Sequence, residues 1–119
     1  MKNVKFLLAA AALACAIPFQ ASAAGAIAVD DQVGDKEPGY GFVTGFDNRD
    51  EAGKAAMKEC RKSGNKSCQV VARFDNCGAY ASSKKYSGAG WGKTQKAAEK
   101  MALEKCGHER CKVHVSDCE

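Results

Sequence analysis

The residues with the clearest chemical potential in this sequence are its cysteines and histidines. Seven cysteines and two histidines occur among the 119 residues. The cysteines from residue 60 onward are Cys60, Cys68, Cys77, Cys106, Cys111 and Cys118. Their thiolates, with His108 and His114, could bind zinc, but the spacings are long and no C-x-x-C pair occurs. We therefore expect no metal site.

The amino-terminal residues have the composition of a secretory signal peptide. Two early lysines precede an apolar run over 6–17, and A-S-A at 21–23 provides the small residues of a cleavage site. The run is about half as long as a membrane-spanning helix requires. We expect residues 1–23 to be removed, which leaves a mature chain that begins at Ala24 and has no transmembrane segment. A lipoprotein signal at Cys15 is the nearest alternative.

Removal of this segment leaves an even number of cysteines. In an oxidising compartment outside the cytoplasm, such a set is typical of a disulfide framework. The remaining 96 residues are enough for one domain with a modest hydrophobic core. We therefore predict a single domain over 24–119 that has three disulfides and binds no cofactor.

The segment S-G-A-G-W-G-K-T at 87–94 partly matches a phosphate-binding loop, which needs G-x-x-x-x-G-K-[ST] before a helix. However, Ser87 replaces the first glycine, and the domain is too small for the parallel sheet that usually carries such a loop. The alternative is a glycine-rich extended segment in which Trp91 packs and Thr94 caps the following helix. We favour this alternative and expect no nucleotide.

The two histidines, with Lys112 between them, could support acid-base chemistry in a small secreted hydrolase. Yet His114 alternates with Val113 and Val115, which places it on the outer face of a strand. His108 lies in a tight connection, and the serines have no evident histidine partner. We therefore expect no catalytic residue, and a hydrolase that uses His108 and His114 is an alternative.

The elements that position these side chains occur twice, which indicates an internal duplication. An alternating segment of strand type occurs at 25–29 and again at 78–82, and a glycine-containing extended segment follows each. Helices are predicted over 49–62 and 95–106, and a strand that begins with cysteine follows each helix. Two strand-strand-helix-strand units that share one antiparallel sheet, with both helices on one face, give an α+β domain.

Local signals set the ends and the faces of these elements. Asn48 and Thr94 are good amino-terminal caps, and Gly64 and Gly107 supply left-handed stops. Small residues line one face of each helix, so each helix can lie close to a sheet. The strand residues expected to share one face are Cys68, Val70, Ala72 and Phe74 after the first helix, and Cys111, Val113 and Val115 after the second.

The duplication also selects one disulfide pairing among the fifteen that six cysteines allow. Each unit has one cysteine at the end of its helix and another at the start of the following strand, so two equivalent local bridges are expected. The remaining two cysteines follow the last strand of each unit, and we expect their bridge to cross the pseudo-twofold axis. The predicted bridges are Cys60–Cys68, Cys106–Cys111 and Cys77–Cys118.

The order of these motifs resembles a family of bacterial secreted proteins known as a domain of unknown function, DUF4189. The segments that carry the resemblance include D-E-A-G-K-A-A-M-K-E-C, C-G-A-Y-A, G-W-G and A-A-E-K-M-A-L-E-K-C. The resemblance covers Gly25 to Cys118. It implies export and small size, and it supplies no established catalytic residues.

Charge is unevenly distributed along the mature chain. Residues 24–53 have a net charge of −5, whereas residues 54–112 have a net charge of +9. Such a polarised domain can steer an oppositely charged partner. The few aromatic residues and the lack of a known binding module argue against nucleic acid. The predicted partner surface consists of Lys54, Lys58, Lys96, Lys100 and Trp91.

These observations predict an exported, non-enzymatic protein of the periplasm or the exterior that binds another protein. Neutralisation of a toxin or an effector is the sharpest version of this prediction, by analogy with other small exported domains. Besides the hydrolase, the sequence leaves open an envelope structural protein that binds anionic glycan or lipid through its basic helices.

Overall fold

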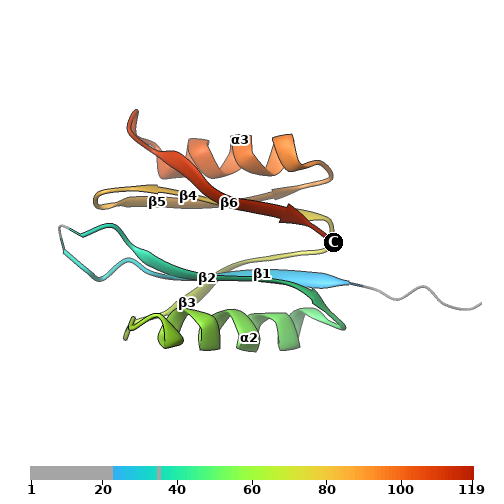
Figure 1. Ribbon diagram of the computed structural model, residues 1–119. Helices are drawn as coiled ribbons and strands as arrows, with labels where there is room; N and C mark the ends of the chain where they lie inside the picture. Colours follow the sequence, from blue (N-terminus) through green and yellow to red (C-terminus); the bar gives the residue numbers. More distant parts are fainter. Residues whose placement is uncertain (1–22, 35) are drawn as a thin grey trace, which may run out of the picture.

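The computed structural model describes residues 23–34 and 36–119, so the predicted signal peptide lies outside the described residues except for Ala23 (Figure 1). The chain forms two β-β-α-β units, as the duplication predicts. The first unit contains β1 (Ala24–Asp30), β2 (Gly39–Phe46), α2 (Arg49–Lys62) and β3 (Gln69–Phe74). The second unit contains β4 (Cys77–Ser83), β5 (Tyr86–Gly92), α3 (Gln95–Cys106) and β6 (Lys112–Cys118).

Each unit forms its own three-stranded antiparallel sheet, with β1 or β4 at the centre. The two sheets pack face to face, and α2 and α3 cover their outer faces, which gives four layers (Figure 1). The predicted α+β class and the duplicated units are therefore confirmed. The prediction of one shared sheet with both helices on the same face is wrong, because each sheet has an apolar layer on both of its faces.

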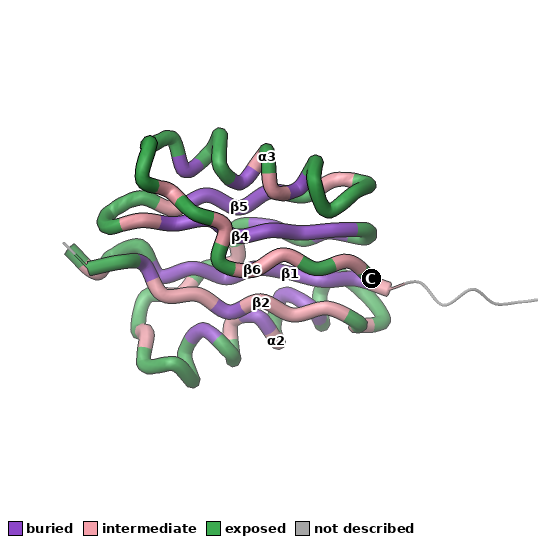
Figure 2. Tube along the Cα trace, turned by 45° about the horizontal axis from the view of Figure 1, so that its top comes forward, coloured by how far each residue is buried: buried purple, intermediate pink, exposed green. Residues whose placement is uncertain are grey.

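The central strands are buried on both faces because their residues alternate between two apolar layers (Figure 2). In β1, three alanines face α2, whereas Ile27 and Val29 face the other sheet. In β4, Cys77 and two alanines face α3, whereas Tyr80 faces the other sheet. Small residues therefore lie under the helices, and larger ones fill the space between the sheets.

Glycines allow each helix to lie close to an edge strand. A Cβ atom at Gly41 would collide with the backbone of α2, and Cβ atoms at Gly88 and Gly90 would collide with the backbone of α3. The alanines predicted to line one face of each helix provide the matching flat surface, since Ala52, Ala56, Ala98 and Ala102 are all fully buried.

The ends of the helices agree with the sequence prediction. The Asn48 and Thr94 side chains each accept a hydrogen bond from the backbone N–H three residues further on, at 2.9 and 3.1 Å. Gly107 ends α3 with a φ of 70°, and Gly64 follows the last turn of α2 with a φ of 95°. Both glycines thus adopt the left-handed conformation that stops a helix.

A bulge in β3 and another in β6 change which residues face the core. Val71 and His114 are each inserted opposite the central strand, where the register shifts. The expectation that alternate residues keep one face is therefore wrong, because each bulge moves the residues after it to the side between the sheets. Those that pack near a helix are Cys68, Val70, Cys111 and Val113, and those that pack between the sheets are Ala72, Phe74 and Val115.

The three predicted disulfides are present: Cys60–Cys68, Cys106–Cys111 and Cys77–Cys118. The last one, however, does not cross the axis between the units. Cys77 begins β4 and Cys118 ends β6, and the two lie directly opposite each other in the second sheet. Because these six cysteines are all disulfide-bonded, none of them offers a thiolate to zinc.

Asp30 ties the end of β1 to the connection between α2 and β3. Its buried carboxylate accepts hydrogen bonds from the backbone N–H groups of Gln32 at 2.9 Å and of Lys66 and Ser67 at 3.1 Å. These hydrogen bonds hold the pKa of Asp30 below its usual value, and the bond from Gln32 has the largest effect.

We expect Asp30→Asn to destabilise the fold at neutral pH but much less in acid. A depressed pKa contributes stability above the unfolded value of about 3.9, and this contribution is lost as the pH falls through the lower folded value. We expect the difference between the wild type and the variant in the free energy of unfolding to shrink below about pH 4. Urea unfolding between about pH 7 and pH 2.5 measures it. Asp31→Asn, at the exposed neighbouring residue, is the control. A difference for Asp30→Asn that is constant with pH would contradict the expectation.

Candidate functional site

The structure does not bring the predicted partner surface together. Lys54 and Lys58 are exposed on α2, and Lys96 and Lys100 are exposed on α3. The two helices cover opposite outer faces of the molecule, so the lysines form two separate pairs (Figure 1). Trp91 lies on neither helix but on the edge strand β5. The prediction that these five residues form one surface depended on the expectation of both helices on one face. It is wrong because the helices lie on opposite faces.

The two histidines take part in separate local contacts. The His108 ring stacks on Tyr86 with centroids 4.5 Å apart, and its Nδ1 accepts a hydrogen bond from the Arg110 backbone N–H at 3.1 Å. His114 is the bulge residue of β6, and its Nε2 lies 2.6 Å from Oε2 of Glu37. Each imidazole therefore contacts its own set of neighbours.

Glu37 links His114 to a serine, but not in the order that nucleophilic catalysis requires. The Ser82 hydroxyl donates to the same Glu37 oxygen at 2.6 Å. A catalytic serine needs the histidine as its direct partner, with the acid behind it. Here the carboxylate lies between the two, and Ser82 is buried. The contacts of Glu37 instead hold the β1–β2 connection against the second sheet.

Tyr80 strengthens the same attachment from the core. Its hydroxyl donates to the carbonyl oxygen of Pro38 at 3.2 Å. Burial raises the pKa of Tyr80 to about 12, so the hydroxyl keeps its proton at physiological pH and remains a donor. Glu37 is thus held by its side chain and Pro38 by its backbone carbonyl oxygen.

Several large apolar side chains are exposed, three of them on the edge strands β3 and β5, which are neighbours on one side of the molecule. Among the described residues, large apolar side chains that are substantially exposed include Val71, Tyr86 and Trp91 on these two strands, and Leu103 on α3. Exposed aromatic residues in a group often mark an interaction site.

Two clefts open between β3 and β5, one beside Trp91 and the other beside Val71. A cleft of about 400 Å³ is lined by Arg73, Trp91 and Lys93, together with the exposed ion pair between Arg49 and Asp75. A cleft of about 250 Å³ contains Val71 and Lys105. The Nζ of Lys105 lies 4.4 Å from the centroid of the Trp91 ring, a cation–π distance. We call this side the Trp91 face, which comprises Val71, Arg73, Trp91, Lys93 and Lys105.

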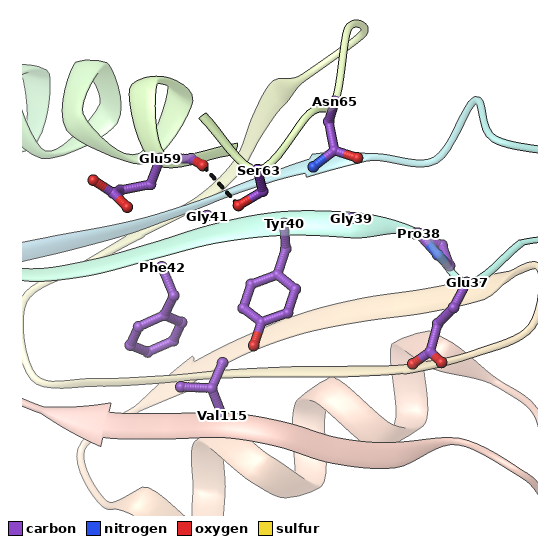
Figure 3. Close-up of a pocket in the computed structure, with 10 residues that line it drawn as sticks. All are labelled: Glu37, Pro38, Gly39, Tyr40, Gly41, Phe42, Glu59, Ser63, Asn65 and Val115. Atoms are coloured by element: carbon purple, nitrogen blue, oxygen red, sulfur yellow. Dashed lines mark hydrogen bonds between the residues drawn. The ribbon is translucent and has the colours of Figure 1, made fainter. Parts of the chain in front are cut away.

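The opposite side, formed by β2 and β6, has a larger cleft of about 610 Å³ (Figure 3). We call it the β2 cleft, and its lining residues are Glu37, Pro38, Gly39, Tyr40, Gly41, Phe42, Glu59, Ser63, Asn65 and Val115. The rings of Tyr40 and Phe42 point from β2 toward β6, and Glu37 and Glu59 lie at opposite ends of the cleft (Figure 3). The lining is therefore acidic and partly aromatic.

The duplication relates the two sides to each other. Gly41 and Gly88 are equivalent, because each lies against the same two positions of its helix, one turn apart. The residue before the helix-end cysteine is Glu59 in the first unit and Lys105 in the second. These two side chains line the β2 cleft and the Trp91 face, respectively. Equivalent positions thus carry opposite charges.

Sequence reasoning identified Trp91 but missed both glutamates of the β2 cleft. Glu37 lies in a loop and Glu59 in a helix, and no motif connects them. Gly41 was the sequence signal that could have indicated this cleft, because a glycine in a strand often marks a close approach of another backbone, here that of α2.

Comparison with known protein families identifies a match over nearly the whole described chain. The model of a family described as a domain of unknown function (DUF4189) matches residues 24–118. The chain matches no curated protein and no solved structure. No helix among the described residues is long and apolar enough to cross a membrane. Within the same residues, no three histidine, cysteine, aspartate or glutamate side chains are grouped to hold a metal ion.

Proposed function

Because the chain belongs to the DUF4189 family, whose description names no function, we propose from its structure that it is an exported, non-enzymatic protein that binds another protein through its Trp91 face. The three disulfides fit an oxidising compartment. The family match begins at Ala24, the residue at which we expect the mature chain to begin. Cleavage of residues 1–23 and release to the periplasm or the exterior belong to this proposal.

The observation that carries the proposal is the exposed Trp91 among basic side chains. Trp91 is 38% exposed, although it lies in a strand of a well-packed sheet. Tryptophan, tyrosine and arginine are the residues most enriched at the energetic centres of protein interfaces. Because Lys105 already contacts the Trp91 ring, less side-chain freedom is lost when a partner binds.

The charges of the Trp91 face indicate the kind of partner. Arg49, Arg73, Lys93 and Lys105 line the two clefts of this face, against Asp31 and Asp75. The excess of positive charge favours an acidic protein surface as the partner. An acidic toxin or effector that is neutralised by occlusion is the sharpest version of the proposal. Non-reducing affinity capture of the mature protein from its own culture, followed by identification of the bound proteins, would supply the partner.

We expect Trp91→Ala to weaken binding to the captured partner by about 30-fold, which corresponds to about 2 kcal/mol at an interface centre. Isothermal titration calorimetry measures this affinity, and circular dichroism checks that the variant is folded. The double variant Lys54→Glu, Lys58→Glu changes the charge of the outer face of α2 and is expected to bind like the wild type. Unchanged affinity of Trp91→Ala, with a loss in the lysine variant, would refute the assignment of this face.

A further inference from the structure

We propose that the β2 cleft is a second binding site, which accepts an extended basic peptide segment as an added strand along the free edge of β2. The site is on the side of the molecule opposite the Trp91 face, and it does not rest on the function proposed for that face. Three features of the cleft support this proposal: the strand edge, the shape of the cleft and its charges.

The first feature is the free edge of a strand. In its sheet, β2 pairs with β1 on one side and has no strand neighbour on the other. Residues 37–42 line the cleft without a gap in sequence, so the cleft follows the backbone of this edge. The outward N–H and C=O groups of an edge strand are a template for a further strand. Backbone pairing can therefore provide much of the affinity.

The second feature is the shape of the cleft, which extends to both faces of β2. Glu59 of α2, with Ser63 and Asn65 from the connection after it, lines one face, and Tyr40, Phe42 and Val115 line the other (Figure 3). The side chains of a strand point alternately to its two faces. Alternate side chains of an added strand would thus meet a polar wall formed by the helix and an apolar wall formed by the two sheets.

The third feature is the negative charge of the cleft. Glu59 and Glu37 line the cleft, and none of its lining residues is a lysine or an arginine. Glu59 is exposed on the helix side, which is the polar wall. Glu37 is fixed by Ser82 and His114, each 2.6 Å from the same oxygen, Oε2. Lysine or arginine side chains of the ligand would supply the complementary charge at both ends.

The equivalent edge in the second unit provides an internal comparison. There β5 is the edge strand, but Lys105 occupies the position that corresponds to Glu59. A basic strand would meet a positive charge at that edge, so the two edges should select oppositely charged segments. Binding of a basic peptide at the edge of β2 and not at the edge of β5 is therefore a direct test of the proposal.

The test uses the disulfide-intact protein and a fluorescein-labelled peptide of seven alternating lysine and valine residues. Fluorescence anisotropy should show binding of this peptide but not of a glutamate-valine control. We expect Glu59→Gln to weaken binding about tenfold, and Glu104→Gln, which removes the same charge from an exposed position of α3, to leave it unchanged. Trp91→Ala should bind the peptide like the wild type, which separates this site from the Trp91 face.

Hydrogen exchange tests the strand pairing itself. Binding should slow amide exchange in the part of β2 that lines the cleft, residues 39–42, and leave β5 (Tyr86–Gly92) unchanged. Equal weakening by Glu59→Gln and Glu104→Gln would mean diffuse charge attraction and would overturn the proposal. Binding without protection of β2 would overturn it too, because the peptide would then be held by its side chains alone.

Discussion

Replacing Cys77 and Cys118 together by alanine is expected to lower the free energy of unfolding by about 4 kcal/mol, the largest loss for any of the three bridges. A crosslink restricts the unfolded chain more when it closes a longer loop. This bridge joins residues 41 positions apart, whereas Cys60–Cys68 and Cys106–Cys111 join residues 8 and 5 apart. By the same relation the shorter bridges contribute about 2 to 2.5 kcal/mol each.

Urea unfolding without reductant measures this order directly. Alanine is the suitable replacement, because Cys77 is buried against α3 and a polar side chain there would add a desolvation penalty. The Cys106→Ala, Cys111→Ala pair is the matched control within the same unit. Equal losses from the long and the short bridge would show that loop length does not determine the stabilisation.

Gly90→Ala is expected to destabilise the protein by about 3 kcal/mol, at the upper end of the range for overpacking. The added Cβ would collide with the carbonyl oxygen of Ala98 and the backbone nitrogen of Ala102. Because both are backbone atoms within α3, no rotamer change relieves the contact, and the whole helix must move away from β5.

Gly45→Ala is the control for Gly90→Ala, because it adds the same methyl group at a glycine where no clash is expected. Gly45 has a φ of 81°, and a Cβ there would have no atom within 4 Å. Its replacement should cost only about 1 kcal/mol, the penalty for a left-handed alanine. Thermal and urea unfolding of both variants would separate the two effects. A Gly90→Ala variant that is no less stable than Gly45→Ala would contradict the close packing of α3 on β5.

Features set by local signals could be predicted from the sequence. The caps at Asn48 and Thr94 and the stop at Gly107 depend on neighbouring residues. The disulfide pairing followed from the duplication, although the third bridge joins two strands of one sheet rather than the two units. The sequence placed Trp91 both as a packing residue of its glycine-rich segment and on the predicted partner surface, and the structure leaves it 38% exposed on β5.

Features set by distant pairing could not be predicted. The bulges at Val71 and His114 exist only relative to β1 and β4, so the sequence of β3 or β6 alone contains no sign of them. The separation into two sheets could not be predicted either. The alternation of alanine with larger apolar residues was interpreted as one buried face of a single sheet. With seven consecutive buried residues, β1 shows instead that both faces were apolar.

The placement of Cys77–Cys118 inside the second unit has a consequence for exchange between chains. Among the described residues each disulfide lies within one unit, so within this part of the chain the two units are joined covalently only by the backbone through Asp75 and Asn76. Domain swapping, in which the first unit of one copy packs on the second unit of another, would keep every disulfide and the whole interface between the sheets. The cost would fall on this two-residue hinge and on the ion pair between Arg49 and Asp75 beside it. Disulfide formation therefore stabilises each unit without determining whether the two units that pack together come from the same chain.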